Sequence, residues 1–381
     1  MLQLPEKYAN VGTTIFTIMS ALAQKHNAIN LSQGFPDFSV DPNLGKLLLD
    51  ASEQGFNQYA PMAGLLSLRQ EIARHIFTSQ NVQVNADTEI TITPGATYAI
   101  YTAFAAILQP GDEVIVFEPA YDSYLPNIEM NGGKAITITL SAPSFSIDWN
   151  QVKDRINAKT KAIILTTPHN PTGTILDQQD WDMLAEIVRD TQIIILSDEV
   201  YEQLVYDGKK HISILRHPEL RLRSFALYSF GKAYHITGWK VGYCVAPPSF
   251  TEAFRKIHQF LSFSVNTPAQ YALSKYIQLP LQQPVCDFMQ QKRDLFLSLL
   301  ENTPFTIYKP SAGSYFQLAG YEQISDLPEH KFAVWLTKTY GVATIPLSAF
   351  YRDKKENKLI RFCFAKKEET LKTAANQLQK L

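Results

Sequence analysis

The chain has 381 residues and a formal net charge of −1, with 45% hydrophobic and 19% charged residues. This length is ample for a large buried core and about two or three domains, and the interspersed charges exclude the basic surface typical of proteins that bind nucleic acid or anionic membranes. A small-molecule ligand is therefore the better expectation. The N-terminus has no signal-peptide pattern, and no later stretch is apolar for the ~18 residues that a membrane span needs, so we expect a cytoplasmic protein.

From about residue 88 the sequence alternates short apolar runs with helical patterns, which is typical of a parallel sheet with crossover helices. The run EITIT (89–93) predicts a strand, and apolar residues at helical spacing follow it. Further strands are predicted in DEVIVFEP (112–119), KAIILTT (161–167), TQIIILSDE (191–199) and SFALYSF (224–230). These runs are apolar on both faces, as buried parallel strands are. They predict one large α/β domain over residues 43–278.

After about residue 278 the pattern loosens. A helix is predicted from Asp287 to Asn302. Weaker strands follow around Thr306, Tyr315 and Ile360. These elements predict a smaller α+β domain over residues 279–381. Residues 1–42 have no sheet partner nearby in the sequence, and we expect them to pack back on this C-terminal part.

The three cysteines, Cys244, Cys286 and Cys363, are an odd number, lie far apart and fit no metal-binding or redox spacing. We expect buried free thiols in a reducing compartment. No metal site is predicted.

Polar residues that could act in catalysis or ligand binding follow three of the predicted strands. Lys232 lies in SFGKAYHITGWKVGY (229–243) after a Ser-Phe-Gly turn, and Asp198 ends the strand in IIILSDEVYEQL (193–204), with Tyr201 three positions later. Open α/β sheets bind ligands at the carboxyl ends of their strands. Asn170, in TTPHNPTG (166–173), is flanked by prolines that shape its turn. Each residue taken alone also fits an ordinary surface, capping or turn role.

Together with LSQGFPDF (31–38) and TPGATYAI (93–100), these motifs resemble those of the fold-type I, class I/II aminotransferases. The resemblance extends in order from roughly residue 30 to residue 365. Within that superfamily the chain most resembles the methionine, kynurenine and glutamine aminotransferase group. The resemblance implies the pyridoxal-phosphate-dependent transferase fold of type I, with a mostly parallel seven-stranded sheet in the large domain. It also implies pyridoxal 5′-phosphate (PLP) as the cofactor.

The resemblance assigns the cofactor's ring and amine chemistry to four residues. Lys232 would form the Schiff base and later move the proton, Asp198 would pair with the pyridine nitrogen, and Tyr201 and Asn170 would hydrogen-bond the phenolic oxygen. Tyr121, in EPAYDSY, resembles the aromatic residue that stacks on the ring.

The phosphate would be held at a helix N-terminus. The predicted strand–helix junction Gly95-Ala96-Thr97 offers backbone donors there. Ser229 and Lys240 resemble further phosphate ligands, although many relatives carry arginine at the second position and lysine lacks its bidentate fork. Tyr59 resembles the tyrosine that reaches the phosphate from the neighbouring subunit, which implies a homodimer with shared active sites.

Arg361, in the short apolar strand KLIRFCFA (358–365), matches the family's carboxylate-binding arginine. A buried arginine needs a carboxylate, and its planar fork suits the α-carboxylate of an amino acid. Gly34 would allow close backbone approach to that carboxylate, and Asn170 is expected to contact the substrate too. Phe16 and Phe263 fall where relatives have aromatic pocket walls, although either could be a core residue. We therefore expect a ping-pong transfer of the amino group to a 2-oxo acid. The expected donor is a neutral, extended amino acid such as methionine, an aromatic amino acid, glutamine or kynurenine.

The sequence leaves three other functions to be compared with aminotransfer. A PLP-dependent C–S β-lyase of the same fold would release pyruvate and ammonia from a cysteine conjugate without a keto-acid acceptor. A non-catalytic ligand-sensing module would need an N-terminal helix-turn-helix, for which the ~30 residues before the family match are too few. A nicotinamide dehydrogenase would need G-x-G-x-x-G after a strand, and none is present.

Overall fold

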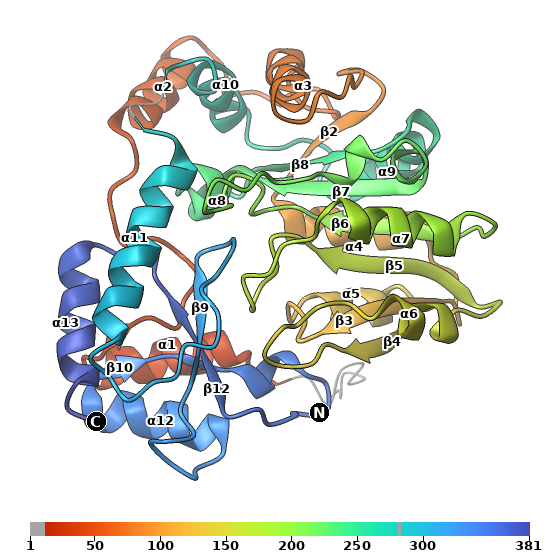
Figure 1. The fold of residues 1–381 in the computed structure, drawn as a ribbon. Helices are drawn as coiled ribbons and strands as arrows, with labels where there is room; N and C mark the ends of the chain where they lie inside the picture. The colour runs from red at the N-terminus through yellow and green to blue at the C-terminus, as the bar shows by residue number, and fades with distance from the viewer. Residues whose placement is uncertain (1–11, 281–282) are drawn as a thin grey trace, which may run out of the picture.

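The computed structural model describes residues 12–280 and 283–381. A seven-stranded sheet forms the centre of its large part, with the strand order β2-β8-β7-β6-β5-β3-β4 (Figure 1). The strands are β2 (Ile90–Thr93), β3 (Glu113–Glu118), β4 (Lys134–Thr139), β5 (Thr160–Thr166), β6 (Ile194–Asp198), β7 (Ser224–Ser229) and β8 (Gly242–Val245). Only β8 runs antiparallel to its neighbours, β7 and β2. The predicted mostly parallel seven-stranded sheet is confirmed.

Helices cover both faces of this sheet. α4 (Ala96–Ile107), α5 (Tyr124–Met130) and α9 (Pro248–Leu261) share a core with the strand face that includes Val114 and Val116. α3 (Leu66–Gln80), α6 (Trp149–Arg155) and α7 (Gln178–Val188) share another core with the face that includes Ile115 and Phe117. Because successive side chains of a strand point to opposite faces, β3 has to be apolar throughout. At the β2 edge, α2 (Pro42–Glu53) and α10 (Thr267–Tyr276) pack on each other.

The small part of the molecule is built from both ends of the described chain (Figure 1). Its antiparallel sheet has the order β11-β12-β9, made of β9 (Phe316–Gly320), β11 (Ile345–Pro346) and β12 (Leu359–Cys363). β1 (Ile29–Asn30) pairs in parallel with β10 (Val342–Ala343), so the N-terminal segment does contact the C-terminal part. The helices of this part are α1 (Ile15–Lys25), α11 (Val285–Leu300), α12 (Glu329–Tyr340) and α13 (Glu368–Leu378). The proposed domain boundaries stay a prediction.

Some predicted details need correction. Thr306 makes only an isolated bridge with Gly320, because one pair of backbone bonds closes there and no strand continues. The predicted helix at Asp287 begins at Val285, directly after Pro284. The three cysteines are free, but Cys286 is only partly buried. No helix in the described ranges is long and apolar enough to cross a membrane.

Candidate active site

A pocket of about 400 Å³ lies where the carboxyl ends of β5, β6 and β7 face the small part. Every site residue predicted from the sequence lines it except Tyr59 and Phe263. The predicted residues in the lining are Phe16, Gly34, Gly95, Ala96, Thr97, Tyr121, Asn170, Asp198, Tyr201, Ser229, Lys232, Lys240 and Arg361. Segments more than 300 positions apart in the sequence therefore meet at one cavity.

Lys232 lies in the one-turn helix α8 (Phe230–Ala233), which takes the place of the predicted turn after β7. Its Nζ donates to the carbonyl oxygen of Gly34 at 3.5 Å and lies 5.7 Å and 5.6 Å from the ring centroids of Tyr201 and Tyr315. Burial lowers the pKa of Lys232 to about 8. The lowered pKa raises the share of the neutral amine near neutral pH. The neutral amine is the nucleophilic form.

Asp198 ends β6, and its carboxylate is buried with two protein donors. The Tyr124 hydroxyl donates to Oδ2 at 2.6 Å and the Val200 N–H donates to Oδ1 at 3.3 Å. Burial raises the pKa of Asp198 to about 6, against the lowering effect of these hydrogen bonds. No cation of the described residues lies within ion-pair distance of this carboxylate. The site can therefore accept a cationic ring nitrogen.

The N-terminus of α4 forms an anion cradle. The N-cap is Gly95, which has a φ of 85° and supplies no side-chain cap. The first N–H groups of the helix, those of Ala96 and Thr97, have no intrahelical acceptor and carry the positive end of the helix dipole. A Cβ atom on Gly95 would lie 3.4 Å from Nζ of Lys240, so this ammonium group sits beside the same cradle. Backbone donors and a nearby cation suit a phosphate.

Arg361 is 1% exposed and lies among polar acceptors and aromatic rings. Nη1 donates to Asn170 Oδ1 at 2.7 Å and Nη2 donates to the Ser32 carbonyl oxygen at 3.0 Å. The buried Nε has no hydrogen-bond partner among the described residues. The guanidinium carbon lies 3.8 Å from the ring centroid of Phe316. Burial lowers the pKa of Arg361 to about 10, and an anionic ligand would relieve its desolvated charge.

Residues 26–378 match the family of class I and II aminotransferases. The chain belongs to this family. The enzyme is 47% identical over 377 residues to the methionine aminotransferase of Escherichia coli (strain K12), which covers 98% of this chain and 97% of the relative. Kynurenine–oxoglutarate transaminase 3 of Homo sapiens is 31% identical, over 97% of this chain and 88% of the relative.

Solved structures agree with the family. An Escherichia coli protein with a methionine aminotransferase function matches with a TM-score of 0.97, 47% identity and full coverage of both chains. N-Succinyldiaminopimelate aminotransferase from Mycobacterium tuberculosis matches with a TM-score of 0.94, 32% identity and full coverage of both chains. The predicted aminotransferase activity is confirmed, and the comparisons favour neither the lyase nor the ligand-sensing module.

Tyr59 and Phe263 of the enzyme lie outside its pocket, on the surface. Tyr59 is 83% exposed and Phe263 is 48% exposed, and their ring centroids are 5.6 Å apart. Large exposed aromatic side chains that touch each other are typical of contact surfaces. Their assigned roles at the phosphate and the substrate stay predictions.

Several pocket residues of the enzyme were not predicted from the sequence. Tyr124 hydrogen-bonds both Asp198 and the Thr166 hydroxyl, and Phe316 packs against Arg361. Tyr124 lies in the same EPAYDSY stretch as Tyr121. Thr166 ends β5 beside the end of β6, so its position at a strand end was a signal that could have identified it. The described ranges contain no group of three or more His, Cys, Asp or Glu side chains that could hold a metal ion.

Proposed function

We propose that the enzyme uses PLP to transfer the amino group of methionine, or of a similar neutral and extended amino acid, to a 2-oxo acid. The observation that carries the proposal is the convergence of Lys232, Asp198 and Arg361 in one pocket. The charged group of each residue is buried, and none has an ion-pair partner among the described residues. Three desolvated charges without ion-pair partners are costly unless charged ligands bind to them.

The protein groups fit PLP part by part. The cofactor supplies an electron sink for the carbanion at the substrate's α-carbon. Asp198 would hold a proton on the ring nitrogen, and the α4 cradle with Lys240 would hold the phosphate. The amine of Lys232 would accept the α-proton. Arg361 would bind and orient the substrate carboxylate through its planar fork.

The pocket favours a neutral donor side chain. Phe16, Tyr121 and Phe316 give it apolar walls, and apolar burial gains ~25 cal/mol per Å². A second substrate carboxylate would meet Asp122 in the lining, but no arginine other than Arg361 among the described pocket residues. Arg352 pairs instead with Glu129 at 3.1 Å, outside the lining. Methionine leads among neutral donors because of the 47% identity to the Escherichia coli methionine aminotransferase.

A donor panel tests this proposal. We expect kcat/KM for methionine to exceed that for aspartate by at least about tenfold, or about 1.4 kcal/mol, with one common 2-oxo acid. Phenylalanine, kynurenine and glutamine complete the panel. Incubation of methionine without an acceptor is the control, because transamination then stops after one half-reaction. Aspartate as the best donor would refute the pocket argument and leave the PLP assignment intact.

We further propose a homodimer in which each subunit contributes Tyr59 to the other's site. The exposure of Tyr59 and its contact with Phe263 support this arrangement. Purified hybrid dimers of Tyr59→Ala and Lys232→Ala are then expected to regain about half of the wild-type activity, because one of their two sites is intact. Each variant alone should have far less activity.

The matched control for this complementation is the hybrid of Asp198→Ala with Lys232→Ala. Both of these residues line the same pocket of one chain, so every site in that hybrid carries a defect and no recovery is expected. Equal activities of the two hybrids would contradict a shared site.

A further inference from the structure

The turn after β6 carries functional side chains on one side and two glutamates on the other. Asp198 and Tyr201 line the pocket, whereas Glu199 and Glu202 do not. Glu199 is fully buried, and the Glu202 side chain is 12% exposed. A buried carboxylate is costly unless it is well paired and hydrogen-bonded. The contacts of these two glutamates must therefore offset the cost of burying them.

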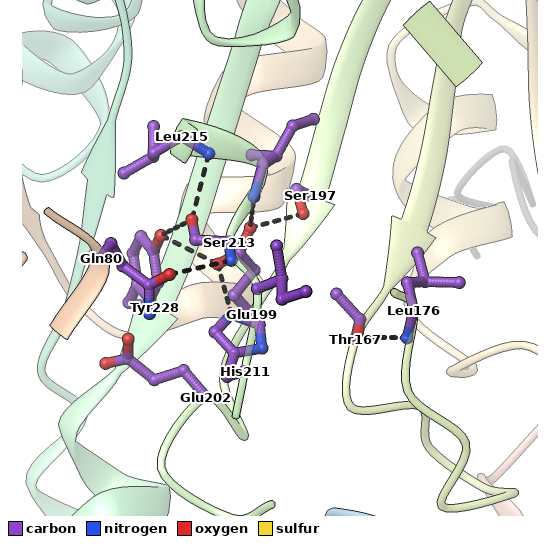
Figure 2. Close-up of polar contacts among 12 residues, drawn as sticks. Gln80, Thr167, Leu176, Ser197, Glu199, Glu202, His211, Ser213, Leu215 and Tyr228 are labelled. Atoms are coloured by element: carbon purple, nitrogen blue, oxygen red, sulfur yellow. Dashed lines mark hydrogen bonds and ion pairs between the residues drawn. The ribbon is translucent and has the colours of Figure 1, made fainter. Parts of the chain in front are cut away.

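The buried Glu199 carboxylate has four hydrogen-bond partners, two on each oxygen (Figure 2). The Ser197 hydroxyl and the Ile214 N–H donate to Oε1 at 2.8 Å and 3.0 Å. His211 Nε2 lies 2.7 Å from Oε2, and the Tyr228 hydroxyl donates to the same oxygen at 3.0 Å. A carboxylate held by several hydrogen bonds in a low-dielectric interior is rigid.

This network extends to segments distant in the sequence. The Ser213 and Tyr228 hydroxyls lie 3.1 Å apart, and Ser213 N–H donates to Gln80 Oε1 of α3 at 3.1 Å (Figure 2). The backbone N–H of Glu199 donates to the Leu227 carbonyl oxygen at 2.8 Å. Glu199 therefore ties the end of β6 to the end of β7 through both its side chain and its backbone.

Glu202 repeats the pattern three residues later. The Tyr243 hydroxyl donates to its Oε1 at 3.3 Å, and His75 Nε2 lies 3.6 Å from Oε1, which is ion-pair distance but longer than a hydrogen bond. Burial acts to raise the pKa of Glu202, but the interactions with His75, His211 and Tyr243 together outweigh it, and the pKa lies below its usual value. The rings of Tyr228 and Tyr243 stack, with centroids 4.6 Å apart, and so connect the two carboxylates.

We propose that Glu199, supported by Glu202, is a positioning residue that holds Asp198 and Tyr201 toward the cofactor. Its bond to Tyr228 acts on β7 as well, because Tyr228 directly precedes Ser229 in the strand that leads to Lys232. One buried carboxylate thus sets the relative position of the two segments that carry the cofactor-binding residues. This inference rests on the proposed function.

The test compares Glu199→Gln with Glu329→Gln. Glu329 is an equally buried carboxylate in the small part, and it accepts backbone hydrogen bonds from Asn357 at 2.7 Å and Leu359 at 3.1 Å. Both variants should unfold at a lower temperature as apoenzymes. Only Glu199→Gln is expected to raise the apparent Kd for PLP, by at least about tenfold, by analogy with metal sites, where loss of the hydrogen bonds that orient the ligands weakens binding by such factors.

A second readout separates positioning from general destabilisation. In the PLP-saturated enzyme, Glu199→Gln should lower kcat about tenfold or more and leave the KM for methionine within about twofold, because Arg361 and Gly34 are untouched. Equal changes in PLP Kd for the two variants at matched loss of Tm, or a wild-type Kd and kcat in Glu199→Gln, would overturn the inference.

If Glu199→Gln does not fold, Tyr228→Phe provides the test. It removes one hydrogen bond to Glu199 and keeps the ring that stacks on Tyr243. We expect its PLP Kd to rise about threefold or more, since one hydrogen bond to a charged group is lost, and an unchanged Kd would overturn the inference. A wild-type enzyme that neither binds PLP nor transaminates would instead refute the proposed function.

Discussion

Lys232→Ala is expected to stop transamination while the protein retains PLP non-covalently. The substitution removes the only lysine amine of the described pocket that lies against Tyr201 and Tyr315. In the proposed mechanism this amine is both the nucleophile for the cofactor and the base for the α-proton. Loss of a residue with both roles should lower kcat by at least about 10⁴-fold, or about 5.4 kcal/mol. The Asp198 and α4 groups that would hold the ring and phosphate remain.

Single-turnover assays with methionine and an absorbance measurement of bound PLP check this result. Lys292→Ala is a suitable control, because Lys292 is also buried but lies on α11, where it is near Glu368 and outside the pocket. The control should retain most of its activity. Substantial turnover by Lys232→Ala would show that another group forms the covalent link, and the central assignment would be wrong.

Asp198→Ala is expected to lower kcat/KM by at least about 10³-fold, or about 4 kcal/mol, whereas Tyr201→Phe should cost about tenfold, or about 1.4 kcal/mol. Asp198 would supply a full negative charge at the ring nitrogen in a site where burial strengthens electrostatic interactions. Tyr201→Phe removes only one hydroxyl and keeps the ring that packs against Tyr315 at a centroid distance of 5.2 Å.

Steady-state kinetics with methionine for both variants, each saturated with PLP, test this order. Asp198→Asn is the informative companion, because it keeps the shape and the Tyr124 contact but removes the charge. It should behave more like Asp198→Ala than like the wild type. Similar mild losses in Asp198→Ala and Tyr201→Phe would mean that the cofactor ring lies elsewhere in the pocket.

Local patterns in the sequence could predict that certain polar residues lie at strand ends, because the rules that place them there are local, whereas the roles of these residues stay predictions. Asp198, Asn170 and Lys232 each follow an apolar run, and parallel strands bring their carboxyl ends to one edge of a sheet. β1, β10 and β11 have only two residues each and leave no periodic signal. The strand predicted at Thr306 is only an isolated bridge. A short apolar run does not show whether backbone pairing continues beyond one residue.

Contacts between distant segments could not be predicted. The hydrogen bond from Tyr124 to Asp198 and the packing of Phe316 on Arg361 depend on how whole elements meet in space. The proposed role of Tyr59 requires a second subunit, so no pattern within one chain could place it, and Phe263 lies on the surface, outside the pocket for which it was predicted as a wall. The resemblance to a family supplied both assignments, and both stay predictions.

The pairing of β1 with β10 also constrains when the pocket can be completed during protein synthesis. Ile29 pairs with Val342, and the Leu31 carbonyl oxygen accepts a hydrogen bond from Cys363 N–H, so the segment that leads to Gly34 is made early but finds its partners late. All strands of the seven-stranded sheet precede β9 in the chain. Because domains form as the nascent chain emerges, the side of the pocket with Asp198 and Lys232 can assemble on the ribosome before β12, which carries Arg361, has been made. Residues 29–34 therefore remain without their strand partners until β10 and β12 have been translated.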